Sequence, residues 1–228
     1  MHTVWSQPHP PQLLLVQASA SGEGSATRRL ASRFAEAWRK SHRSAGWTER
    51  DVAEAPIPHV GAAYLANMLE PPRSESDGER HQSFRLTKTL QREVLSASHI
   101  VISTPMHIFS VPSSLKAWVD HIFHEGVVFE GGAEGVKGLL GGKRVLLITS
   151  RGGDYRPPSP LTDFDMLVPY FRSLFLFCGV DDFFSFDVHN ASFDPIDHQA
   201  QLDALPRDIE AFARSWGATS ASTGPATA

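Results

Sequence analysis

Apolar residues recur along the chain in two alternating patterns, short continuous runs and helical spacings. Such runs predict strands at residues 13–16, 100–102 and 143–150, and the less continuous segments 47–52 and 180–188 are interpreted as two further strands. Apolar positions three and four residues apart predict helices at residues 30–38, 62–69, 81–96, 115–123, 163–177 and 199–216. Strands that alternate with helices are typical of a doubly wound parallel sheet. We therefore expect an α/β fold, with a five-stranded sheet in the order 2-1-3-4-5 and helices on both faces.

Prolines and glycines refine the expected boundaries of these elements. Ser110 is the expected N-cap of the helix at residues 115–123, and Pro112 suits its first turn. Pro169 must fall in the first turn of its helix or kink it, and Pro206 is expected near the start of the last helix. An exposed loop is expected after residue 69. Residues 131–142 are interpreted as a long glycine-rich connection.

The composition indicates one globular domain. The chain has 228 residues, of which 41% are hydrophobic and 20% charged, and this fits a single domain at residues 12–216 with a full core. Residues 1–11 are expected to form a flexible extension that is not a secretory signal, and residues 217–228 an unstructured tail. The net charge of −4 comes without a basic stripe, so no nucleic-acid partner is expected.

Cysteine content and hydropathy count against a disulfide-bonded, a metal-binding and a membrane-spanning protein. Cys178 is the only cysteine, which excludes an intrachain disulfide and a cysteine-based metal site, and we expect no metal. No apolar run reaches the ~18 residues of a membrane span. We therefore expect a cytoplasmic protein with no membrane partner.

The loop after the first predicted strand has the chemistry of a phosphate site. It is rich in small and hydroxyl residues from Ser19 to Thr27, and a helix follows it. A helix N-terminus offers free N–H groups and a partial positive charge to an anion. The spacing Gly22-x-Gly24-x-x-Thr27 approaches a dinucleotide fingerprint but lacks its third glycine, which suits a terminal monophosphate better than a pyrophosphate. A capped helix after a polar loop is the alternative.

Two further loops follow the third and fourth predicted strands. In the first, Pro105 stiffens the turn, while Met106 and Phe109 offer apolar surface to an aromatic ring system. In the second, Gly152 and Gly153 let backbone N–H groups approach a ligand closely. Each loop alone could be an ordinary turn. In the expected sheet order, however, all three loops open at one edge, where ligands of such sheets bind.

With these motifs the sequence resembles the flavodoxin-like FMN-dependent NADH azoreductases and quinone reductases, over roughly residues 12–215. The family pattern is a serine-rich phosphate loop, then Pro-Met-Tyr-Asn-Phe, then Ser-Arg-Gly-Gly. The last two motifs stand here as residues 105–109 and 150–153. His107 occupies the Tyr position and Ile108 the Asn position. The helix after the second motif, with Leu115-Lys116 and Asp120, also matches.

The resemblance implies FMN as cofactor and assigns three groups of binding residues. The residues assigned to the FMN phosphate are Ser19, Ser25, Ala26 and Thr27. Those assigned to the isoalloxazine ring are Pro105, Met106, His107, Ile108 and Phe109. Those assigned to the pyrimidine edge of the ring are Ser150, Arg151, Gly152 and Gly153. Phe177 and Tyr155 are assigned to the substrate site. No side chain is assigned a catalytic role, because the flavin carries the chemistry.

The implied activity is ping-pong transfer of two electrons from NADH or NADPH to a quinone or azo compound. A homodimer is expected as well, because residues 163–177 are apolar on more sides than one core-facing stripe needs. A fully buried helix is the alternative for that segment. For the whole chain, the alternatives are a flavodoxin-like electron carrier without small-molecule turnover and an NAD-dependent Rossmann dehydrogenase. Such carriers are usually shorter and strongly acidic, and the missing third glycine counts against the dehydrogenase.

Overall fold

The computed structural model describes residues 10–69 and 78–216. The predicted extension up to residue 9, the predicted loop at residues 70–77 and the predicted tail from residue 217 lie outside the described residues.

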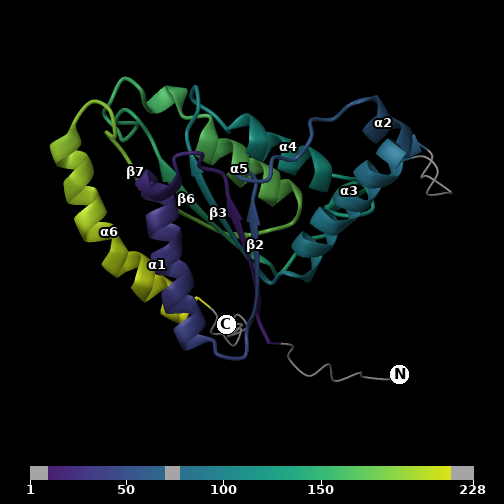
Figure 1. Cartoon of the computed structure of the whole chain (residues 1–228), viewed down its shortest axis with the longest axis horizontal. Helices are drawn as coiled ribbons and strands as arrows, with labels where there is room; N and C mark the ends of the chain where they lie inside the picture. The colour runs from purple at the N-terminus through teal and green to yellow at the C-terminus, as the bar shows by residue number, and fades with distance from the viewer. Residues whose placement is uncertain (1–9, 70–77, 217–228) are drawn as a thin grey trace, which may run out of the picture.

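Five parallel strands form the central sheet, in the order β2-β1-β3-β6-β7 (Figure 1). Their bounds are β1 Gln12–Gln17, β2 Gly46–Asp51, β3 His99–Pro105, β6 Arg144–Ser150 and β7 Asp182–Val188. The three central strands are buried along nearly their whole length. Helices cover both faces of a parallel sheet, so its central strands are continuous apolar runs, and this is why the sequence pattern located them.

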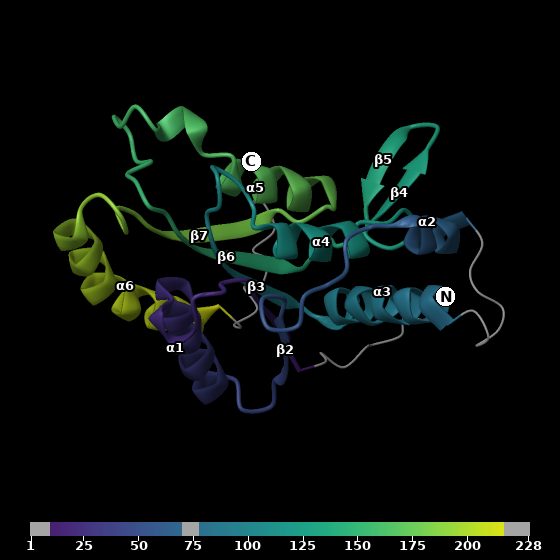
Figure 2. The same cartoon turned by 45° about the horizontal axis from the view of Figure 1, so that its top comes forward.

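Helices form a layer on each face of the sheet (Figures 1 and 2). Helices α1 and α6 pack side by side on one face, α3, α4 and α5 cover the other, and α2 lies against α3. The bounds are α1 Ala26–Ser41, α2 Ala62–Leu69, α3 Gly78–Ser96, α4 Ser113–Ile122, α5 Leu167–Phe177 and α6 Pro195–Ser215. In the described ranges no helix is both long and apolar enough to cross a bilayer. The cytoplasmic location stays a prediction.

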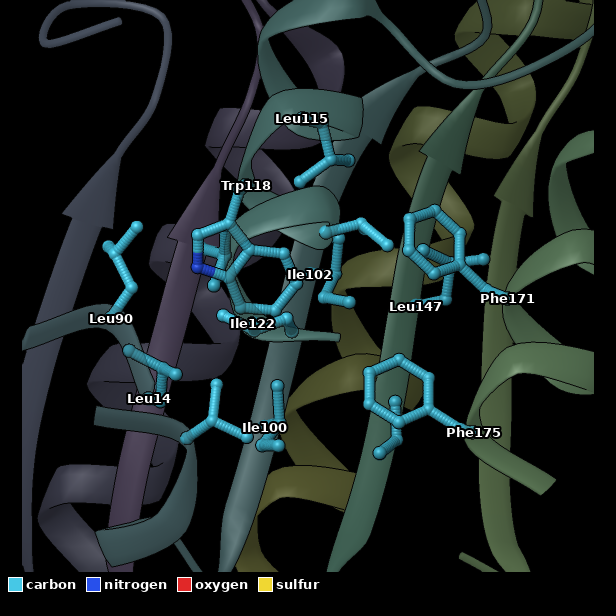
Figure 3. Packing of buried hydrophobic residues seen from close by; sticks show 14 of the residues in the cluster. Leu14, Leu90, Ile100, Ile102, Leu115, Trp118, Ile122, Leu147, Phe171 and Phe175 are labelled. Carbon is cyan, nitrogen blue, oxygen red and sulfur yellow. The ribbon is translucent and has the colours of Figure 1, made fainter. Parts of the chain in front are cut away.

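Trp118 marks the centre of the core under the α3–α5 layer. Its side chain is fully buried and lies between Leu90 of α3 and Ile102 of β3 (Figure 3). Successive residues of a strand point to opposite faces, so Ile100 and Ile102 join this cluster while Val101 packs towards α1 and α6. Burying a large apolar side chain stabilises a protein by ~1.5–3 kcal/mol. Because such side chains are buried on both faces of the sheet, the two helix layers hold the strands, and therefore their ends, in place.

A β-hairpin occupies most of the segment expected to be a long connection. Strand β4, Phe129–Gly132, pairs antiparallel with β5, Gly135–Gly138, and the hairpin projects beside α2 (Figure 2). These strands come fourth and fifth along the chain, so the last two strands of the sheet are β6 and β7. A β-carbon on Gly138 would lie 2.1 Å from the carbonyl carbon of Cys178. The hairpin therefore packs directly on the backbone at the end of α5.

Two predicted helix starts are wrong. Helix α4 has Pro112 at its N-cap and no side-chain cap. Ser110 cannot serve as the cap, because it is hydrogen-bonded to His107 within the preceding turn. Helix α6 begins at Pro195, earlier than expected, so Pro206 lies inside the helix and not near its start.

Helix α5 begins later than predicted and ends at the single cysteine. A 3₁₀ turn, η2 Thr162–Phe164, precedes the helix, and Pro169 falls in its first turn as expected. A second 3₁₀ turn, η1 Gly22–Gly24, precedes α1. Cys178 caps α5 and is buried with a free thiol. Burial raises the pKa of the Cys178 thiol to about 12, so it stays protonated at neutral pH.

Candidate functional site

The loops after β1, β3 and β6 meet at the carboxyl edge of the sheet. The parallel register aligns the strand ends, with Gln17 opposite Ser103. Two backbone hydrogen bonds connect the segments: Ala18 N donates to Ser103 O at 2.9 Å, and Met106 N donates to Ser150 O at 2.8 Å. The structure thus brings the three predicted binding segments to the edge where ligands of open α/β sheets bind.

The loop after β1 presents the N-terminus of α1. Ser25 is the N-cap, since its Oγ accepts from Arg28 N at 3.2 Å, and it also lies 3.1 Å from Thr27 Oγ1. The N–H groups of Ala26 and Thr27 have no acceptor in the part of the chain that the structure describes. Ser19 is buried in the same loop. Free N–H groups, hydroxyls and the positive end of the helix dipole together suit a phosphate.

Arg28 links this loop to the end of β2, a contact that sequence reasoning missed. Its Nε donates to Ser19 O at 2.8 Å, and its Nη1 donates to Asp51 Oδ2 at 2.5 Å. The hydrogen bond to Asp51 raises the pKa of Arg28 above its ordinary value. Because Asp51 neutralises much of this cation, the helix N-terminus is the main attraction for an anion. The position of Asp51 at the end of a predicted strand was the only available signal.

A tight turn with left-handed backbone follows β3. His107 and Ser110 donate N–H groups to each other's carbonyl oxygens, at 3.0 Å in both directions. Between them, Ile108 has φ +43° and Phe109 has φ +67°. This region costs L-residues about 1–2 kcal/mol each, and a β-branched residue there is a genuine outlier. Backbone strain of this kind gathers at ligand sites, and the side chain of Ile108 is 89% exposed.

The segment before α5 supports this turn. Met166 N donates to Phe109 O at 2.9 Å, and the ring centroids of Phe109 and Phe164 lie 5.5 Å apart. Pro105 and Met106 are half-buried, whereas the three residues after them are exposed. The turn therefore offers an apolar surface to a ligand and has a fixed backbone beneath it.

The Ser150–Gly153 segment uses its carbonyl groups internally and leaves two N–H groups free. The N–H groups of residues 190–192 donate to the carbonyl oxygens of residues 151–153 at 2.9–3.1 Å. Among residues 10–69 and 78–216, no acceptor contacts the N–H of Gly152 or Gly153. A β-carbon added to Gly152 would lie 3.1 Å from Ser192 Oγ, and one added to Gly153 would lie 2.8 Å from Leu161 Cδ1. The glycines are therefore required by the protein's own packing, and their N–H groups can serve a ligand.

The side chain of Arg151 braces this loop from below. It is 1% exposed, and its Nη2 donates to Asp165 Oδ2 at 2.7 Å while its Nη1 donates to Asp187 Oδ1 at 3.1 Å. Thr149 also accepts from this guanidinium. Asp165 in turn accepts from the first N–H groups of α5. The backbone N–H of Arg151 is engaged as well, donating to Val188 O at 2.8 Å. Sequence reasoning missed both aspartates, since only the fold brings them to this arginine.

The two predicted substrate-site residues lie far apart within one chain. Tyr155 stays at the carboxyl edge, where its N donates to His189 Nδ1 at 3.1 Å and its ring lies 5.9 Å from Arg151 Cζ. Phe177 ends α5, with its ring centroid 5.2 Å from that of Phe129 in the hairpin. The 11 residues of α5 span about 16 Å. Phe177 therefore lies a helix length away from the loops of its own chain.

The donor set at this edge fits FMN. A helix N-terminus with buried hydroxyls suits the phosphate, and the exposed apolar turn at residues 107–110 suits a planar ring. The free N–H groups of Gly152 and Gly153 suit a polar edge that becomes negative on reduction.

Comparison with known proteins agrees with this arrangement. The family model described as a flavodoxin-like fold matches residues 11–213. The FMN-dependent NADH:quinone oxidoreductase of Azotobacter vinelandii is 37% identical over 171 residues, which cover 75% of this chain and 83% of the relative. The enzyme of the same name from Nostoc punctiforme is 35% identical over 170 residues, covering 75% and 82%.

A solved structure confirms the fold independently. The FMN-dependent NADH-azoreductase of Bacillus anthracis, in complex with FMN, superposes with a TM-score of 0.81 at 21% identity, covering 91% of this chain and all of that one. From the family match and the identity to the relatives, the chain belongs to the flavodoxin-like family of FMN-dependent NADH:quinone oxidoreductases.

Proposed function

We propose that the protein is an FMN-dependent oxidoreductase that passes two electrons from NADH or NADPH to quinones or azo compounds. The observation that carries this proposal is the convergence of three loops with phosphate, ring and polar-edge chemistry on one edge of the sheet. The names of the relatives, with FMN, NADH and quinone, support the same cofactor and substrate class.

Each loop has one role in this proposal. Ser19, Ser25, Ala26 and Thr27 hold the phosphate at the start of α1. The turn from His107 to Ser110 supports the ring with its exposed apolar side chains. When bound, FMN supplies the redox chemistry, accepting two electrons from the nicotinamide and passing them to the acceptor. The N–H groups of Gly152 and Gly153 favour negative charge at the polar edge of the ring. The nicotinamide and the electron acceptor would occupy the same place beside the ring one after the other, and this corresponds to ping-pong order.

We also propose a homodimer, supported by the exposed apolar end of α5. The buried residues of this helix are Leu167, Phe171 and Phe175. Leu176 is 60% exposed and Phe177 43% exposed, so the helix is not fully buried in one chain, and a symmetry mate would cover this surface. Because Phe177 lies far from its own loops, it would reach a substrate only in the partner's site.

The test is the absorbance spectrum of the purified protein. We expect flavin bands that bleach when NADH is added without oxygen and that return when a quinone is added. Cofactor released by heat should be FMN by chromatography. Release of FAD, or a protein without flavin that binds none when FMN is supplied, would contradict the proposal. Bleaching by NADH without turnover of any quinone or azo compound would indicate an electron carrier instead.

A further inference from the structure

The segment after β7 runs back along the Ser150–Gly153 loop and takes up its carbonyl groups. Asn190 N donates to Gly153 O at 3.1 Å, Ala191 N to Arg151 O at 3.0 Å, and Ser192 N to Gly152 O at 2.9 Å. The N–H groups of residues 190–192 thus engage the carbonyl oxygens of residues 151–153, although not in chain order. With the carbonyl groups engaged on this side, the N–H groups of Gly152 and Gly153 remain available at the edge of the sheet.

Asn190 makes this return of the chain possible. Its φ is +65°, a left-handed conformation that asparagine adopts more readily than most residues with a β-carbon. Its side chain is 8% exposed, and its Nδ2 donates to Asp197 Oδ2 at 2.7 Å. Asp197 lies in the first turn of α6 and also accepts from Arg156 and Gln201, each at 2.8 Å. The turn is therefore anchored to α6.

The segment also packs against the glycines on the side of their missing β-carbons. A β-carbon on Gly152 would lie 3.1 Å from Ser192 Oγ, and one on Gly153 would lie 3.4 Å from the ring of Phe193. A side chain at either glycine would press on this segment, so the loop and the segment lie close together only because both residues are glycine. Both the hydrogen bonds and the packing hold the loop in one position.

We propose that Asn190 is a positioning residue whose left-handed turn clamps residues 151–153, aims the N–H groups of Gly152 and Gly153 at the flavin, and so sets FMN affinity and reduction potential. This inference rests on the proposed function. Fixed donors stabilise the extra negative charge of the reduced ring more than the oxidised ring. Loosening the clamp should therefore weaken binding of reduced FMN more than binding of oxidised FMN.

The experiment compares Asn190→Ala with Asn190→Gly, since glycine keeps the left-handed backbone without a side chain. For Asn190→Ala we expect the Kd for oxidised FMN, measured by fluorescence quenching, to rise roughly tenfold. We also expect the reduction potential of the bound flavin to become more negative. Asn190→Gly should restore part of both quantities, because it keeps the backbone conformation and loses only the bond to Asp197. Asp203→Asn, elsewhere on α6, is the control and should change neither.

A purely structural role for Asn190 would weaken both redox states of FMN equally and leave the potential unchanged. An unchanged potential in Asn190→Ala, or equal losses in the alanine and glycine variants, would overturn the clamp. If Asn190→Ala does not fold, Asp197→Asn releases the anchor more mildly and should shift the potential in the same direction. A wild-type protein that binds no FMN would overturn the proposed function itself, whereas FMN binding that is insensitive to these variants would overturn only the clamp.

Discussion

Ile108 combines a β-branched side chain with a left-handed backbone. At φ +43° and 89% exposure, it has the strain of this conformation and little burial to offset it. The sequence predicted a turn here and predicted that the turn would meet a ligand. It could not predict the backbone angle, because isoleucine carries no local signal for the left-handed region. The angle follows from the paired hydrogen bonds of His107 and Ser110.

Replacing Ile108 with asparagine should stabilise the protein without its cofactor. Asparagine tolerates positive φ, so we expect the free energy of unfolding to rise by about 1 kcal/mol in urea titrations. Ile108→Gly should relieve the strain as well, but with less gain because glycine has more freedom in the unfolded chain. Ile108→Val keeps the β-branch and is the matched control. Equal stability of the asparagine and valine variants would contradict this account.

The motif predicted that Arg151 binds the flavin, yet its buried side chain forms ion pairs with Asp165 and Asp187 of the protein itself. Arg151→Met should lower the free energy of unfolding of the apoprotein by about 3 kcal/mol, because it leaves Asp165 and Asp187 without their buried partner. The measurement is denaturant unfolding with FMN removed. If Arg151→Met kept normal apoprotein stability and lost only FMN affinity, the prediction that the Arg151 side chain binds the flavin would stand.

At the scale of elements, the hairpin β4–β5 was the main feature missed. Its strands are short, rich in glycine and largely exposed, so they lack the buried apolar run by which the sheet strands were found. Its position depends on a close contact between distant segments, Gly138 against the backbone of Cys178 and Gly179. A pattern read along the chain contains no information about such a contact.

Two neighbouring glycines test this contact. A β-carbon on Gly138 would lie 2.1 Å from Cys178 C, whereas one on Gly141 would meet only Gly179 O, at 3.7 Å. Gly138→Ala should therefore lower the free energy of unfolding by about 1–3 kcal/mol, and Gly141→Ala should change it little. Thermal unfolding of the two variants side by side gives the comparison. Similar melting temperatures would show that the hairpin can move away from α5 without cost.

Helix α5 provides the test of the homodimer. Leu174 packs against the core, so a charge there would also disturb folding, and exposed Leu176 is the cleaner choice. If the dimer forms as proposed, Leu176→Glu should yield a folded monomer with little quinone reductase activity. Val136→Glu, at a residue 54% exposed on the hairpin, is the matched control. Light scattering that gives 25.0 kDa for an active wild-type protein would refute the dimer.

For the molecule as a whole, the α/β class, the parallel sheet and the edge that gathers the loops were all predictable from sequence. Buried strands and amphipathic helices leave strong local patterns, and connection rules then limit the topology. Helix starts were less predictable, because a cap such as Ser110 can be taken up by a neighbouring turn. The braces at the site, Arg28–Asp51 and Arg151–Asp165, join segments that only the fold brings together.

Buried histidines should make the whole molecule sensitive to mild acid. Burial lowers the pKa of His99, His121, His124 and His189 below the ordinary value of 6.5. Below pH 6.5 the unfolded chain binds protons that the folded chain resists, so the free energy of unfolding falls as pH falls towards the folded pKa values. Above pH 6.5 these groups are neutral in both states, and their full contribution is present.

Urea unfolding at pH 7.5 and at pH 5.5 measures this effect. We expect lower stability at pH 5.5, and a smaller difference in His121→Gln, whose amide can replace the imidazole between Thr87 and Pro58. Equal stability at both pH values would show that the buried rings are protonated without cost.

The distance between Phe177 and the loops of its own chain predicts that two inactive variants can complement each other. In the proposed pair, each reaction centre would be shared between two polypeptides, and two inactive chains could complement one another. One chain would carry Gly152→Val, which spoils its loops, and the other Phe177→Ala. Refolded together in equal amounts, they would form mixed pairs with one intact centre each, and about a quarter of wild-type activity would return. If each chain contained its whole centre, the mixture would stay as inactive as its parts.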